Sequence, residues 1–167
     1  MMMKSRDKGR LSSEGLEQLL MQGNHATLPE LFDADPTSIR RKITGLTYSA
    51  DEPLRKAAIE GIRFLSEQRA HLQPDFFREI IRRHIWGMND EGGNIDHSAP
   101  EIIGAVIAGR LDLYREFISI LFYTAVAEPF FHESLLAALT MIEKSQAGAT
   151  GELIELLEAE IRNREFL

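Results

Sequence analysis

The chain has 167 residues, of which 44% are hydrophobic, and carries a formal net charge of −7. A chain of this length can bury a core of its own, so we expect one domain that needs neither a metal nor a disulfide for stability. It contains no cysteine, which excludes disulfides, thiolate zinc sites and cysteine nucleophiles.

Neither a membrane span nor a secretory signal is expected. The longest apolar stretches, such as Phe117 to Val126, are too short to cross a bilayer. The basic N-terminal segment, Lys4 to Arg10, runs almost directly into Ser12-Ser13-Glu14 without the apolar region of a signal peptide. We therefore expect a cytoplasmic protein.

Charge is distributed unequally along the chain. Residues 1–88 carry 14 basic and 12 acidic side chains, whereas residues 89–167 carry 5 basic and 14 acidic ones. An acidic second half repels a phosphate backbone, so we expect no general nucleic-acid binding. The basic side chains near Arg40, Arg55 and Arg82 have carboxylates close by in sequence, which predicts a salt-bridged surface.

Six prolines mark expected helix starts, because proline is tolerated in the first turn of a helix and hardly elsewhere in one. They are Pro29, Pro36, Pro53, Pro74, Pro100 and Pro129. Apolar side chains follow at helical spacing. In chain order, this pattern predicts helices over residues 13–22, 27–32, 37–48, 54–65, 74–85, 98–108, 111–126, 129–145 and 150–162. No sustained alternation indicates a strand.

Three helical pairs recur along the chain. Their first helices begin near Thr37, Asp75 and Asp112, at intervals of 37 to 38 residues, which is typical of stacked helical hairpins. We expect a disordered segment over residues 1–11 and one all-α domain over 12–167, an α-α superhelix of about four stacked hairpins. Residues 98–109 carry a single charge, so this helix is expected at the centre. Gly61 and Gly104, each inside the second helix of a pair, indicate that another helix approaches closely at both positions.

The segment Asp51-Glu52-Pro53-Leu54-Arg55-Lys56-Ala57-Ala58 resembles the second helix of a HEAT repeat, and the chain from about Ser12 resembles a short HEAT-like α-solenoid. The pattern Trp86…Asn89-Asp90-Glu91…Gly93…Ala99-Pro100-Glu101 is similar to a motif in short bacterial HEAT-like proteins. The second resemblance implies a fold and brings no activity with it.

One loop stands out, because nine residues separate Met88 from Ser98 and three of them are acidic. Long polar loops of this kind often carry function. The candidate binding residues are Trp86, Asn89, Asp90, Glu91, Asn94, Asp96, His97 and Glu101.

Three interpretations of this loop remain open. In the first, Asp96 or Ser98 caps the following helix and Glu101 completes the cap. In the second, Trp86 anchors a partner and the carboxylates form a charged rim, so that Trp86, Asp90, Glu91 and His97 share one patch. In the third, His97 and Glu101, four residues apart, bind a metal together with nearby carboxylates.

His132-Glu133 is similar to the His-Glu dyads of the HEAT-repeat deoxyhypusine hydroxylases, which bind two irons. That family requires several dyads, and this chain has one. We therefore expect a structural role for His132 and predict no metal or cofactor.

The expected function is a non-enzymatic binding or adaptor module of HEAT type whose partner is a protein or a peptide segment. No Gly-x-Ser-x-Gly elbow or glycine-rich phosphate loop is present. The alternative is a small metal-binding protein or enzyme that uses the loop of residues 86–101. Nothing in the sequence indicates an oligomeric state.

Overall fold

The computed structural model describes residues 12–90 and 96–165, and all regular structure within these ranges is helical. The predicted all-α fold is thus confirmed for the described residues. The helices are α1 (Ser13–Met21), η1 (His25–Thr27), α2 (Leu28–Ala34), α3 (Pro36–Leu46), α4 (Glu52–Arg69), α5 (Pro74–Met88), α6 (Ala99–Gly109), α7 (Leu111–Tyr114), α8 (Phe117–Val126), η2 (Pro129–Phe131), α9 (His132–Ser145) and α10 (Gly151–Glu165).

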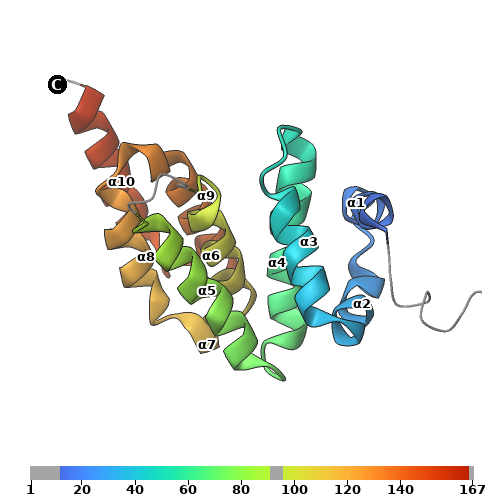
Figure 1. The fold of residues 1–167 in the computed structure, drawn as a ribbon. Helices are drawn as coiled ribbons and strands as arrows, with labels where there is room; N and C mark the ends of the chain where they lie inside the picture. Colours follow the sequence, from blue (N-terminus) through green and yellow to red (C-terminus); the bar gives the residue numbers. More distant parts are fainter. Residues whose placement is uncertain (1–11, 91–95, 166–167) are drawn as a thin grey trace, which may run out of the picture.

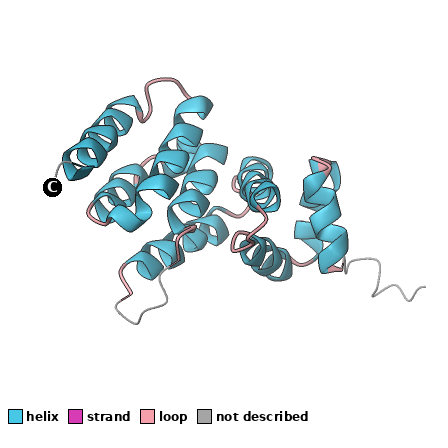
Figure 2. Ribbon diagram, turned by 90° about the horizontal axis from the view of Figure 1, so that it is seen from above, coloured by secondary structure: helices cyan, strands magenta, loops and turns pink. Residues whose placement is uncertain are grey.

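Figure 1 shows α1 to α4 on one side of the molecule and α5 to α10 on the other, with α1 and α2 at one end and α10 at the opposite end. Figure 2, seen from above, shows that helices joined by loops make up the described chain. At the centre, α6 packs against α4, α5 and α9. Helices distant in sequence therefore pack together, as α1 does with α4 and α6 does with α9.

Proline placement agrees with the prediction, because each of the six prolines lies in the first turn of a helix. The missing proline N–H falls where a helix has no internal acceptor for it. The three predicted first helices begin at Pro36, Pro74 and Leu111, each within one residue of the expected start.

The segment 111–126 differs from the prediction of one helix, because it forms the short α7 and then α8. Tyr114, buried in α7, donates its hydroxyl to the carbonyl oxygen of Pro74 at 2.8 Å and so ties α7 to the start of α5. The buried residues Leu111, Tyr114, Ile118 and Leu121 keep helical spacing across the break, which is why the sequence pattern conceals it.

Helix α6 forms the centre of the core, as expected from its lack of charge. Ile102, Ile103, Val106 and Ile107 have no exposed surface. A Cβ atom at Gly104 would lie 2.6 Å from the Cβ of Ala138 and 2.8 Å from its Cα, far inside van der Waals contact. The predicted close helix approach at Gly104 is confirmed, and α9 is the partner.

Polar contacts at the start of α6 correct the expected helix cap. The Ser98 hydroxyl donates to the carbonyl oxygen of Thr47 at 2.9 Å and makes no cap hydrogen bond. The N–H of Glu101 donates to the Ser134 hydroxyl oxygen of α9 at 3.1 Å. These groups find partners on neighbouring helices, which a local capping rule cannot foresee. Asp96 does accept the N–H of Ser98, at 2.8 Å.

None of the described helices is long and apolar enough to cross a membrane.

Candidate functional site

The loop begins at the end of α5 with the exposed indole of Trp86, of which 80% is accessible. The side-chain amide of Asn89 donates to the carbonyl oxygen of Ile85 at 3.1 Å, so Asn89 closes the last turn of α5. Asp90 is exposed. Glu91 and Asn94, also predicted as binding residues, lie outside the described residues.

At the far end of the loop, Asp96 lies close to side chains from two other parts of the chain. Its Oδ2 accepts the Tyr48 hydroxyl at 3.0 Å and lies 4.0 Å from Nε2 of His84. Partial burial of the Tyr48 hydroxyl, together with the negative charge of Asp96, raises the pKa of Tyr48 to about 12. The carboxylate therefore holds the loop to Tyr48, which follows α3, and lies beside His84 of α5.

His84 is largely buried on α5, with 12% of its side chain accessible. Its Nδ1–H donates to the carbonyl oxygen of Ile80 at 2.8 Å, which turns Nε2 toward Asp96. Burial lowers the pKa of His84, and the attraction of Asp96 opposes this only partly, because Arg40 and Arg83 add to the lowering. His84 is thus a neutral neighbour of Asp96 near pH 7.

His97 points to a different neighbour. Its ring lies against that of Phe130, which belongs to η2, with the centroids 3.6 Å apart and the planes tilted by 36°. Both side chains are exposed. Asp96 and His97 are adjacent in sequence, yet they link the loop to opposite halves of the chain.

Glu101 is separated from the loop residues by its contacts. It is buried in α6, and its Oε1 lies 2.8 Å from Nη1 of Arg55 on α4. Glu101 thus contacts Arg55, whereas His97 contacts Phe130. Among the described residues, no group of three or more His, Asp or Glu side chains is arranged to hold a metal ion.

In the dyad His132-Glu133, the histidine makes a contact between helices. His132 is buried, and its Nε2 lies 2.8 Å from the carbonyl oxygen of Val126, to which it donates. The ring thereby ties α9 to the end of α8. Glu133, the next residue, is exposed.

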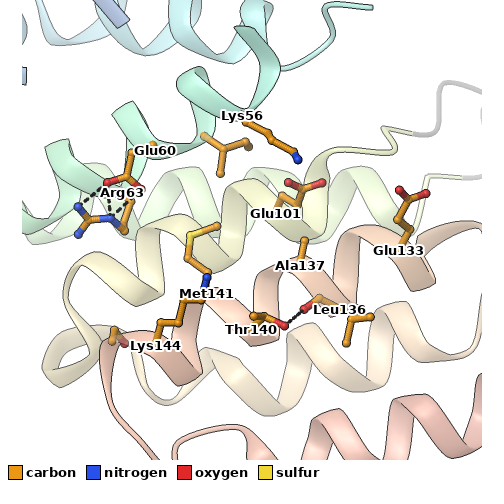
Figure 3. Close-up of a pocket in the computed structure, with 12 residues that line it drawn as sticks. Lys56, Glu60, Arg63, Glu101, Glu133, Leu136, Ala137, Thr140, Met141 and Lys144 are labelled. Atoms are coloured by element: carbon orange, nitrogen blue, oxygen red, sulfur yellow. Dashed lines mark hydrogen bonds and ion pairs between the residues drawn. The ribbon is translucent and has the colours of Figure 1, made fainter. Parts of the chain in front are cut away.

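Glu101 instead faces a groove of about 660 Å³ between α4 and α9 (Figure 3). The apolar part of the groove is formed by Ile59, Leu136, Ala137 and Met141. Figure 3 shows Glu101 and Glu133 at one end, and Arg63 and Lys144 toward the other. The remaining lining residues are Lys56, Glu60, Thr140 and Ser145.

Most charges along the groove are paired. Lys56 lies 3.1 Å from Glu52, and Arg63 binds both Glu60 and Glu67 at 2.6 Å. These two carboxylates, against the opposing effect of burial, raise the pKa of Arg63 above its ordinary value. Two other basic side chains of the first half pair on the surface, as predicted: Arg78 with Asp75 and Arg83 with Glu79. Arg40 and Arg41, by contrast, form no ion pair with a described residue, and burial together with the charges of Arg83 and Arg41 lowers the pKa of Arg40.

Helix α9 explains why the groove was missed from the sequence. One face of it, Leu135, Ala138, Leu139 and Ile142, is buried in the core. A second face carries the groove residues Glu133, Leu136, Ala137, Thr140, Met141 and Lys144, spaced by three and four positions. This second stripe, with a charge at each end, is the sequence feature from which the groove could have been predicted.

Comparison of the chain with protein-family models, curated proteins and solved structures found no match. The site is therefore interpreted from its own geometry.

Proposed function

We propose that this protein is a non-enzymatic binding module, a short HEAT-like superhelix that takes up a segment of a partner protein in the groove between α4 and α9. The observation that carries the proposal is the half-exposed apolar stripe of Leu136, Ala137 and Met141 on α9, which lines a groove with a charged rim. Apolar surface surrounded by polar groups is the composition of protein interaction sites.

The charges of the groove favour a protein segment over a nucleic acid. Three cationic and three anionic side chains line it: Lys56, Arg63, Lys144, Glu60, Glu101 and Glu133. Nucleic-acid sites need a basic excess to replace counterions around the phosphates. A balanced groove instead fits a polypeptide that carries both signs of charge.

The helical arrangement supports the HEAT-like part of the proposal. The second helices of the three predicted pairs are α4, α6 and α9, and α6 packs between the other two. The first helices α3 and α5 pack against α4 and α6, respectively. In such a superhelix, one layer of helices forms a continuous binding face. Here that face carries the groove.

A substitution that fills the groove tests the proposal. Thr140 lines the groove, and its hydroxyl donates only to Leu136 of the same helix, at 2.8 Å. Thr140→Trp therefore fills the groove without removing a side-chain hydrogen bond between helices. Glu158→Trp, on an exposed position of α10 outside the groove, is the matched control.

In affinity capture from native lysate with quantitative mass spectrometry, we expect Thr140→Trp to lose a partner that the parent and Glu158→Trp retain. Identical sets of captured proteins for all three chains, with unchanged thermal unfolding, would contradict the proposal that the groove binds a partner.

The exposed Trp86 supports a second contact surface at the end of α5. An accessible indole of this size is a common anchor in protein interfaces. Trp86→Ala should then weaken capture of a partner independently of Thr140→Trp. Equal capture by Trp86→Ala and the parent would contradict this second surface.

A further inference from the structure

The groove has a direction, because its three helices run parallel. Arg55 of α4 pairs with Glu101 in the first turn of α6, and the Ser66 hydroxyl, further along α4, donates to the carbonyl oxygen of Val106 at 2.7 Å. The N-terminal part of α4 thus faces the N-terminal part of α6, and their C-terminal parts also face each other. Helices α6 and α9 repeat this order, since Ser134 accepts from Glu101 and Ala138 contacts Gly104.

Two charges on the groove have no partner among the described residues, and they stand at opposite ends. Glu133 lies in the first turn of α9 and Lys144 in its last turn, while no ion pair or hydrogen bond joins either side chain to the rest of the described chain. Eleven positions of helix separate them, or about 16 Å. The free charges therefore define a negative end and a positive end.

The groove favours a helix as its occupant. Its walls are side chains of α4 and α9, so it offers no free strand edge to an extended peptide. A helix satisfies its own backbone and can present an apolar stripe at i, i+3, i+4 and i+7 to Leu136, Ala137 and Met141.

The parallel helices also set the direction of that occupant. The first turns of α4, α6 and α9 gather at the Glu133 end, and each helix N-terminus carries partial positive charge. The C-terminus of an occupant helix, with partial negative charge, is preferred beside them. Basic side chains in its last turn would meet Glu133, and acidic side chains in its first turn would meet Lys144.

We infer that the groove binds an amphipathic helix of a partner protein, antiparallel to α9, with acidic residues in its first turn and basic residues about three turns later. This inference rests on the proposed function and adds to it the class of partner and its orientation. The same charge order suits the occupant's own dipole, so such a helix is favoured before binding as well.

A peptide library tests the charge order directly. The probe is a phage-displayed library of 16-residue, helix-biased peptides, selected on the full chain. Clones are then sorted by loss of binding to Thr140→Trp, with Glu158→Trp as the control. Met141→Arg provides a second block at a half-exposed position if Thr140→Trp does not fold.

We expect clones that depend on the groove to carry acids near the N-terminus and bases about eleven positions later. By fluorescence anisotropy, a synthetic peptide from this set should bind about fivefold more tightly than its charge-reversed isomer, since two exposed ion pairs are involved. In the double variant Glu133→Lys with Lys144→Glu, the preference should invert.

Two results overturn the inference in different ways. Groove-dependent clones without this charge order, or a preference that the double variant leaves unchanged, would overturn the orientation and leave the proposed binding function standing. A selection in which no clone distinguishes the blocked groove from the control would overturn both.

Discussion

Helix α6 and the loop that precedes it differ in how their side chains find partners. In α6, apolar residues are buried on all sides by α4, α5 and α9. In the loop, Asp96 binds Tyr48 while the adjacent His97 packs on Phe130. The core is determined by apolar pattern and helix contact, whereas the loop depends on single polar contacts with distant segments. Substitutions should therefore affect the two regions very differently.

The largest effect is expected in α6. Ile103→Ala and Ile107→Ala each remove a side chain with no exposed surface and leave a cavity, so the free energy of unfolding should fall by about 2–5 kcal/mol. Trp86→Ala, at an exposed site, should change it by less than about 0.5 kcal/mol. Chemical denaturation measures the free energy of unfolding of each variant. Equal decreases for the α6 variants and for Trp86→Ala would contradict the difference between core and loop.

Gly104→Ala should destabilise by about 1–3 kcal/mol, because its Cβ would meet the backbone of Ala138. Gly61→Ala is the matched control: its Cβ would meet side-chain ends alone, that of Leu20 at 2.7 Å, which can move, and that of Leu28 at an ordinary contact distance of 3.7 Å. The higher helix propensity of alanine, worth about 1 kcal/mol, offsets that contact. Thermal unfolding that ranks Gly61→Ala as the worse variant would contradict this packing.

Arg55→Ala tests the polar contact beneath the groove. Because the substitution leaves the buried Glu101 carboxylate without its cation, we expect a loss of about 1–3 kcal/mol. Arg83→Ala breaks a comparable pair with Glu79, but both of those side chains are more than half exposed, so its effect should stay below about 0.5 kcal/mol. Urea denaturation of the two variants supplies the comparison, and similar midpoints would argue against a structural role for the Arg55–Glu101 pair.

The smallest effect concerns His84. Because its pKa is lowered by burial, the folded chain binds this proton less readily than the unfolded chain, and stability rises with pH. The free energy of unfolding should begin to decrease as pH falls through about 6.5, the ordinary pKa of histidine. The decrease should level off below the lowered pKa of His84. His84→Gln should flatten this part of the profile between pH 7 and 5. A variant with the parent's slope would assign the dependence to other groups.

The sequence was sufficient for most of the helices and for the central position of α6, because proline placement and apolar spacing are local signals. It did not reveal the break between α7 and α8, across which the apolar spacing continues. It was insufficient for Ser98 and Glu101, whose partners Thr47, Ser134 and Arg55 lie 33 to 51 residues away. A helix cap was one of three interpretations that the sequence left open for these two residues, and their partners on distant segments do not follow from a local rule.

The groove was hidden for a related reason. Its residues on α9 read as part of an ordinary amphipathic helix, although Leu136, Ala137 and Met141 lie outside the buried face. Only the position of α4 across α6 shows that this stripe borders a groove. The loop was prominent in sequence because it is polar, whereas the groove combines ordinary residues from three helices.

Site-specific photo-cross-linking tests the central claim most directly. A photoreactive phenylalanine derivative would replace Met141 inside the groove, or Glu158 on the exposed side of α10 as the control. After irradiation in native lysate, we predict that position 141 cross-links to a defined segment of another protein and that position 158 does not. Identical cross-links from both positions, or none from position 141, would contradict a partner-binding groove between α4 and α9.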